Sequence, residues 1–217
     1  MAVDVQLLKD FEKGKIGATL RIYSWAPACL SLGYSQKKEK LLNERLVKQY
    51  GWDVVKRPTG GGIVFHNEDE ITYCLILPYD FKGLPQGLIP LYKYISEIIV
   101  SALKKIGVPA AISNNAARRE NADLCFSYPA EYEVVANGKK IVGSAQKRGK
   151  RGFLQHGSIF VTRKNYDNFF KVLKAGSATD LESAISVEEV LEKKIDDKEI
   201  IAALKESFTS VFNRNTI

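Results

Sequence analysis

A cysteine and two lysines lie close together in the stretch 124–146, LCFSYPAEYEVVANGKKIVGSAQ. Cys125 comes shortly before Pro129, so the segment around it is unsuited to a regular helix or a central strand. A cysteine at the edge of a loop with cations nearby can be held as the thiolate, which is the form that attacks acyl groups. Cys125 is therefore a candidate nucleophile. The alternative is that it is a third buried thiol, because cysteine is among the most buried residue types.

Lys139 and Lys140 follow Asn137-Gly138, a dipeptide typical of the two-residue turn of a β-hairpin. Successive side chains of a strand point to opposite faces, so only one of these lysines can face the interior of the sheet. With a two-residue turn, Lys140 shares its face with Val142 and Ser144. Lys140 is the candidate partner of Cys125; the alternative is that both lysines lie in solvent beside a tight turn.

Three successive glycines stand between two predicted strands in RPTGGGIVFH. Glycine has no Cβ, so backbone N–H groups in such a run can come close to a ligand. The spacing matches neither a P-loop nor a dinucleotide fingerprint. The alternatives are a flexible turn and a pocket for a polar head group, and the polar side chains that flank the run on both sides support the second. The candidate residues here are Arg57, Thr59, Gly60, Gly61, Gly62 and His66.

The remaining cysteines and histidines give weaker signals. Cys29 and Cys74 lie in apolar strand patterns, ACLSLG and TYCLIL, and are expected in the core. His156, in LQHGS, is either a base or a satisfied polar group within a sheet. The three cysteines are widely spaced and the histidines show no ligand spacing, so we expect neither a disulfide framework nor a metal site.

Length and composition indicate one globular domain. The chain has 217 residues, of which 45% are hydrophobic and 26% charged. No apolar run approaches the roughly 18 residues that a membrane span needs. The N-terminal segment lacks the apolar region of a secretory signal, so we expect a cytoplasmic protein with no membrane partner.

The net charge of +7 suggests an acidic partner. Cations gather at 37–40, 117–120 and 139–152, but the last cluster has no aromatic residue among its cations before Phe153. A nucleic-acid site typically has aromatic residues interleaved with its cations, or a helix–turn–helix. An acidic protein therefore fits the charge at least as well, and we expect no nucleic acid.

Hydrophobic periodicity predicts an α+β fold with a largely antiparallel sheet and flanking helices. Helices are expected over 4–13, 37–50 and 89–106, and strands over 19–25, 29–34, 52–58, 71–78, 132–136, 139–144 and 153–162. The C-terminal third reads as helical, with a capping box at Ser186–Glu189. We expect a single domain over 1–217, with the helical part from about 175 packed on it.

Five ordered blocks together resemble the biotin/lipoate protein ligase catalytic domain. They are SLGYSQ, KRPTGGGIVFH followed by EITY, LCFSYPAEYEVV, GKKIVGSAQKR and LQHGSI. The similarity extends from about residue 2 to about residue 170, and within the superfamily it is closest to the cysteine-dependent octanoyltransferases of lipoate biosynthesis.

This resemblance implies a reaction in two acyl transfers. An octanoyl group passes from acyl carrier protein to a cysteine as a thioester, and then to a lysine of a lipoyl domain such as the glycine-cleavage H protein. Cys125 falls on the nucleophile position, and Lys140 on the lysine that contacts the acyl carbonyl or activates the acceptor. The matching blocks also hold substrate-binding candidates at Arg57, Thr59, Gly60, Gly61, Gly62, His66, Gly143, Ser144, His156 and Gly157. No cofactor is implied, and a monomer is the simplest expectation.

Two other functions remain open. An ATP-dependent lipoate–protein ligase would form an acyl-adenylate over the glycine run, and ATP would be its cofactor. A non-catalytic module would hold an acylated carrier or a lipoyl domain. ATP dependence separates the ligase from the transferase.

Overall fold

The computed structural model describes residues 1–113, 132–174 and 183–214. Its largest element is a six-stranded antiparallel sheet in the order β1-β5-β9-β8-β7-β6. The strands are β1 Thr19–Tyr23, β5 Ile71–Pro78, β9 Gly152–Ile159, β8 Lys139–Arg148, β7 Val134–Ala136 and β6 Ala110–Ile112. A second sheet has the order β3-β2-β4, formed by Asp53–Lys56, Cys29–Leu32 and Val64–His66. In it, β2 runs parallel to β3 and antiparallel to β4.

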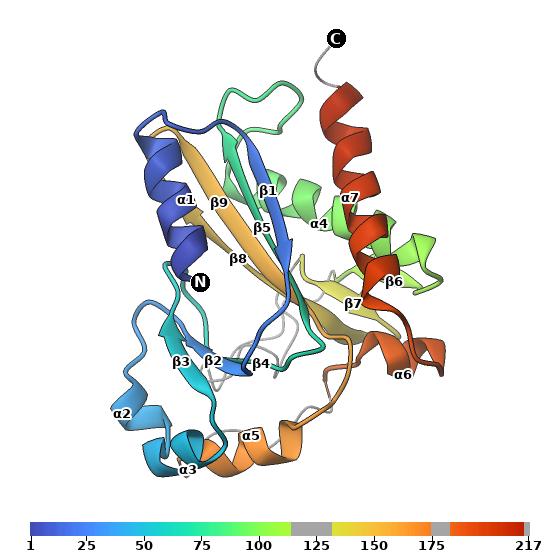
Figure 1. Cartoon of the computed structure of the whole chain (residues 1–217). Coiled ribbons are helices and arrows are strands. Elements are labelled where there is room, and N and C mark those ends of the chain that lie inside the picture. Colours follow the sequence, from blue (N-terminus) through green and yellow to red (C-terminus); the bar gives the residue numbers. More distant parts are fainter. Residues whose placement is uncertain (114–131, 175–182, 215–217) are drawn as a thin grey trace.

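Helices cover both faces of the six-stranded sheet (Figure 1). On one face lies α1, Ala2–Glu12, whose Phe11 packs with Cys74 and Ile76 of β5. On the other lie α4, Leu88–Lys105, and α7, Asp197–Arg214, which share a larger core with Tyr73 and Leu75 of the same strand. Because successive side chains of β5 point to opposite faces of the sheet, this strand contributes residues to two separate cores.

A third core lies beneath the small sheet. There α3, Glu44–Gln49, and α5, Tyr166–Val172, pack with β4. Phe65 of β4 stacks on Phe169 at 5.3 Å between ring centroids and meets Tyr166 edge-on at 5.2 Å. Such aromatic packing fixes the position of β4, which carries His66 at its end.

The predicted helix over 37–50 is wrong in one respect, because the structure divides it into α2, Lys38–Leu41, and α3. Leu42 is extended and bridges to Leu173, and Asn43 caps α3 by accepting a hydrogen bond from the Leu46 backbone N–H at 3.3 Å. Asparagine at this position starts a new helix rather than continuing the old one. The short strands β4 and β6 were not predicted.

Most of the other expected elements are confirmed. The capping box at Ser186 and Glu189 begins α6, Val187–Leu191, and the apolar face of α7 lies in the core. The 132–144 stretch forms the predicted hairpin, with Asn137 and Gly138 both at positive φ. The α+β class is confirmed: a mixed, largely antiparallel sheet architecture with flanking helices. Among the helices within the described ranges, none is long and apolar enough to cross a bilayer.

Candidate active site

A pocket lies between the two sheets and brings together six of the predicted site residues. It encloses about 370 Å³ of empty space, including the part open to solvent. The small sheet contributes Ser31, Val64 and His66, and the large sheet contributes residues of β5, β8 and β9. The predicted residues on its wall are Arg57, His66, Gly143, Ser144, His156 and Gly157. Segments nearly a hundred residues apart in sequence therefore form one site.

The glycine run is held from behind by Arg57. Its Nη2 donates to the carbonyl oxygens of Gly60 at 3.0 Å and Gly62 at 2.5 Å, and its Nη1 donates to the Ser31 carbonyl at 2.8 Å. A planar guanidinium suits such convergent carbonyls, which a lysine could not bind together. Arg57 is buried, and its hydrogen bonds to the Gly60 and Gly62 carbonyls hold the loop in its conformation.

Gly33, in the SLGYSQ block, lets the glycine run lie against β2. A Cβ at Gly33 would come within 1.9 Å of the Gly61 carbonyl oxygen, a distance that no real side chain tolerates. The neighbouring Tyr34 backbone N–H donates to the Thr59 carbonyl at 2.9 Å. The loop is thus fixed to the small sheet on one side.

On its other side the loop is bonded to the large sheet. Thr59 Oγ1 lies 2.7 Å from His156 Nε2, and both side chains are buried. Burial lowers the pKa of His156 to about 3, so the ring is neutral at pH 7. Within the described residues its Nδ1 has no hydrogen-bond partner, although it lies on the pocket wall. His156 therefore offers one uncommitted polar atom to a ligand.

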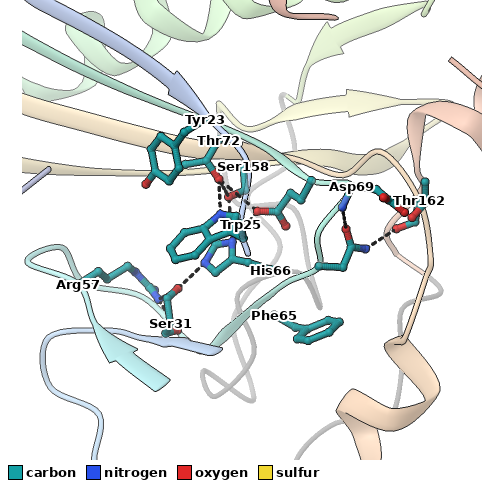
Figure 2. Close-up of polar contacts among 12 residues, drawn as sticks. Tyr23, Trp25, Ser31, Arg57, Phe65, His66, Asp69, Thr72, Ser158 and Thr162 are labelled. Carbon is teal, nitrogen blue, oxygen red and sulfur yellow. Dashed lines mark hydrogen bonds and ion pairs between the residues drawn. The ribbon is translucent and has the colours of Figure 1, made fainter. Parts of the chain in front are cut away.

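A second buried histidine, His66, forms the centre of a polar network (Figure 2). Its Nε2 lies 2.7 Å from Ser31 Oγ, and its Nδ1 lies 2.5 Å from Glu70 Oε1. Trp25 stacks on the imidazole with ring centroids 4.2 Å apart. The network joins β2 and β4 of the small sheet to Thr72 of β5, because Thr72 Oγ1 donates to Glu70 Oε1 at 3.3 Å.

Gly143, Ser144 and Gly157 form the floor where β8 pairs with β9. Gly157 lies opposite Ser144, whose Oγ is 2.8 Å from the Tyr73 hydroxyl. A Cβ at Gly157 would meet Ser144 Oγ at 2.4 Å and Tyr73 Cε1 at 2.6 Å. The glycine in LQHGS is therefore required by the closeness of these neighbours.

The hairpin separates the two lysines as expected. Lys139 is exposed, whereas Lys140 is only 1% exposed and its Nζ donates to Glu133 Oε1 at 2.7 Å. The alternative with both lysines in solvent is wrong. Lys140 is held in an ion pair within the protein, a contact that the sequence alone did not predict.

Cys125 lies outside the described residues, within the stretch 114–131, so its prediction as the nucleophile stays a prediction. The other two cysteines are buried free thiols, as expected. Burial raises the pKa of Cys29 to about 12 and raises that of Cys74 as well. Neither provides a thiolate at neutral pH.

Several site residues were missed by the sequence reasoning: Trp25, Ser31, Glu70, Thr72 and Ser158. Glu70 had a usable signal, since it stands four residues after His66 and is the first residue of the quoted EITY. Ser31 and Ser158 stand in the blocks SLGYSQ and LQHGSI, but an alternating strand pattern does not tell which polar residue faces another sheet. Among the described residues, no group of three His, Cys, Asp or Glu side chains could hold a metal ion.

Comparison with known proteins agrees with this architecture. Residues 1–209 match the lipoyl protein ligase A/B catalytic domain. The octanoyltransferase LipM of Moorella thermoacetica is 36% identical over 225 residues, covering 99% of this chain and 80% of that protein. The octanoyltransferase LipM of Bacillus subtilis is 34% identical over 227 residues, covering 98% and 81%. A crystal structure of lipoate-protein ligase A bound with ATP shares the fold, with a TM-score of 0.73 at 23% identity over 90% of this chain and 73% of that one.

The chain belongs to the lipoyl protein ligase A/B catalytic domain family. The two sequence relatives named above are octanoyltransferases, which confirms the expected enzyme class, an acyltransferase.

Proposed function

We propose that this protein is an octanoyltransferase that takes an octanoyl group from octanoyl-acyl carrier protein as a Cys125 thioester. It then passes the group to a lysine of a lipoyl domain, such as that of the glycine-cleavage H protein. The reaction needs neither ATP nor a metal, and it takes place in the cytoplasm between a monomeric enzyme and its two protein partners.

One observation carries the proposal: the blocks that the octanoyltransferases share converge on a single pocket. Arg57 and His66 come from one block, Gly143 and His156 from two others, and all four line the same space between the sheets. Acyl transfer needs polar groups at the carbonyl and an apolar slot for the chain. The Nδ1 of His156, which has no hydrogen-bond partner in the part of the chain that the structure describes, and the side chain of Val64 support such a mixed wall.

Lys140 acts in this proposal as the cation near the reacting carbonyl. Its burial and its ion pair with Glu133 keep the ammonium in one place, so that its position is set before substrate binds. Net charge supports the choice of partners, because +7 favours encounter with acidic proteins through electrostatic steering.

Intact-protein mass spectrometry tests the thioester route. The wild type and Cys125→Ser are each mixed with octanoyl-acyl carrier protein in the absence of ATP. We expect a single octanoyl adduct on the wild type only. An adduct that persists in Cys125→Ser contradicts the role of this cysteine.

The second candidate is an ATP-dependent lipoate–protein ligase, because the chain shares its fold with a lipoate-protein ligase A bound with ATP. It predicts the opposite result in the same experiment. No adduct would form from the carrier, and a lipoyl domain would be labelled only when ATP and the free acid are supplied.

A further inference from the structure

Ser31, His66 and Glu70 form a row of hydrogen-bonded side chains that begins on the wall of the pocket between the sheets. Ser31 Oγ is 2.7 Å from His66 Nε2, and Glu70 Oε1 is 2.5 Å from His66 Nδ1. A hydroxyl, an imidazole and a carboxylate in hydrogen-bond sequence form the arrangement that proteins use to move a proton away from a reacting group. Ser31 and His66, both labelled in Figure 2, line the pocket, and Glu70 is not among its lining residues.

The surrounding donors determine the direction of each hydrogen bond. Arg57 Nη1 lies 3.3 Å from Ser31 Oγ and can only donate, so Ser31 accepts from the guanidinium and is left to donate its own proton to His66. Glu70, as a carboxylate, can only accept, so the Nδ1 of His66 carries the ring proton. His66 Nε2 is therefore the free base of the row.

The carboxylate of Glu70 is placed to stabilise a positive charge on the imidazole of His66. Glu70 is buried, and within the described residues its Oε2 has no hydrogen-bond partner. Burying a carboxylate with an oxygen unpaired is costly unless a cation compensates it. Besides Thr72, Glu70 Oε1 contacts the ring of His66, which is stacked on Trp25, and a proton taken up at Nε2 of that ring would supply the positive charge.

We infer that Ser31 and His66 form a proton relay, positioned by Glu70, that deprotonates the acceptor lysine before it attacks the acyl group. This role rests on the proposed function, in which a lysine is the acceptor. A lysine ammonium cannot attack a carbonyl until it loses a proton and becomes an amine. Ser31 Oγ takes the ammonium proton as its own proton passes to His66 Nε2, and His66 then releases it to water. The amine forms the new C–N bond, the C–S bond of the thioester breaks, and the second amine proton ends on the departing thiolate.

A comparison of two acceptor amines tests the relay. The acceptors are a lipoyl domain with its lysine and the same domain with S-(2-aminoethyl)cysteine at that position, whose amine is less basic. Octanoyl transfer to each is followed by mass spectrometry for the wild type, Ser31→Ala and Glu70→Gln. Asp69→Asn is the matched control, because it removes a carboxylate from the same β4–β5 turn that pairs with the surface residue Lys164 instead.

With lysine as acceptor, we expect Ser31→Ala and Glu70→Gln to be slower by about 100-fold, within the range of general-base effects. With the less basic amine, these two variants should be only about tenfold slower than the wild type, because more of that amine is already neutral. Asp69→Asn should match the wild type with both acceptors. An equal deficit for the two amines, or no deficit, would overturn the relay and leave a network that only joins the sheets.

Failure of the relay and failure of the thioester route give different results. The enzyme adduct formed without an acceptor reports only on the thioester. If the acyl group proves to be activated by ATP instead, the amine comparison is run with that activated acyl group, because the same lysine must still lose its proton. A wild type that transfers to neither amine contradicts the relay as well.

Discussion

Thr59 and His156 are joined by a 2.7 Å contact between Oγ1 and Nε2 that crosses from the glycine run to the central strand β9. This hydrogen bond fixes the loop against the large sheet, while Gly33 fixes it against the small one. The position of the loop therefore depends on both sheets.

Thr59→Val should lower the free energy of unfolding by about 1–3 kcal/mol, because it leaves the buried Nε2 of His156 without this partner. Urea denaturation measures the change. Thr59→Ser keeps the hydroxyl and is the control. Equal destabilisation by both variants would mean that packing around the methyl group, rather than the hydrogen bond, is what matters.

His156 should make the protein less stable in acid. The unfolded ring binds a proton near pH 6.5, whereas in the folded protein its pKa is about 3, so protons favour the unfolded chain between these values. Stability is fully present above about pH 6.5 and falls by up to about 1.4 kcal/mol per pH unit below it. Urea denaturation from pH 7.5 to 4.5 should show a shallower fall for His156→Gln than for the wild type. Parallel curves would contradict this contribution.

Gly33→Ala should impair octanoyl transfer while leaving the protein folded. The added methyl group needs the space of the Gly61 carbonyl, so the glycine run must move away from β2. We expect a loss of at least tenfold in transfer rate, in line with the sensitivity of acyl transfer to small misplacements. Gly17→Ala is the matched control, because its Cβ would meet nothing within 4 Å. Equal activity of the two variants would exclude a role for the loop position.

Lys140→Met should reduce transfer by about 100-fold or more and should also cost stability. Breaking a buried ion pair typically costs about 3–5 kcal/mol, and Lys140 loses its 2.7 Å contact with Glu133. Lys139→Met changes the neighbouring, exposed lysine and should affect neither property. Transfer rates are compared at a temperature where both variants are folded, as judged by circular dichroism. Similar rates would remove Lys140 from the mechanism.

Cys29 and Cys74 should resist alkylation in the native protein. Burial raises the pKa of both thiols, so almost no thiolate is present at pH 8, and iodoacetamide needs the thiolate. Peptide mapping after brief labelling, with and without urea, measures this. Rapid modification of either residue in the absence of urea would contradict the burial.

Local patterns in the sequence predicted the features that depend on neighbours along the chain. The Asn137-Gly138 turn and the alternation of strand side chains were enough to separate Lys139 from Lys140. The capping box at Ser186 and the apolar face of α7 were predicted in the same way. Asn43 carried a similar local signal, an N-cap, which the continuous leucine pattern around it obscured.

Contacts across the fold could not be predicted in this way. The pairing of Lys140 with Glu133 lies next to a register shift between Val134 and Val135, and a residue pattern does not show where a strand is irregular. Ser31 meets His66 because β2 pairs antiparallel with the three-residue strand β4, and this strand is too short to show a period. The family blocks gave six residues of the pocket wall, but only the packing of one sheet against the other gives their contacts.

Arg57 holds the carbonyls of Gly60 and Gly62 from inside the protein. Gly60, Gly61 and Gly62 are not among the residues that line the pocket, and they have no side chain that substitution could shorten or recharge. A change in preferred acyl length would have to be engineered on the pocket wall itself, at positions such as Val64 and Ala145. Selection for new substrates should accordingly accumulate replacements on that wall and leave the glycine run unchanged.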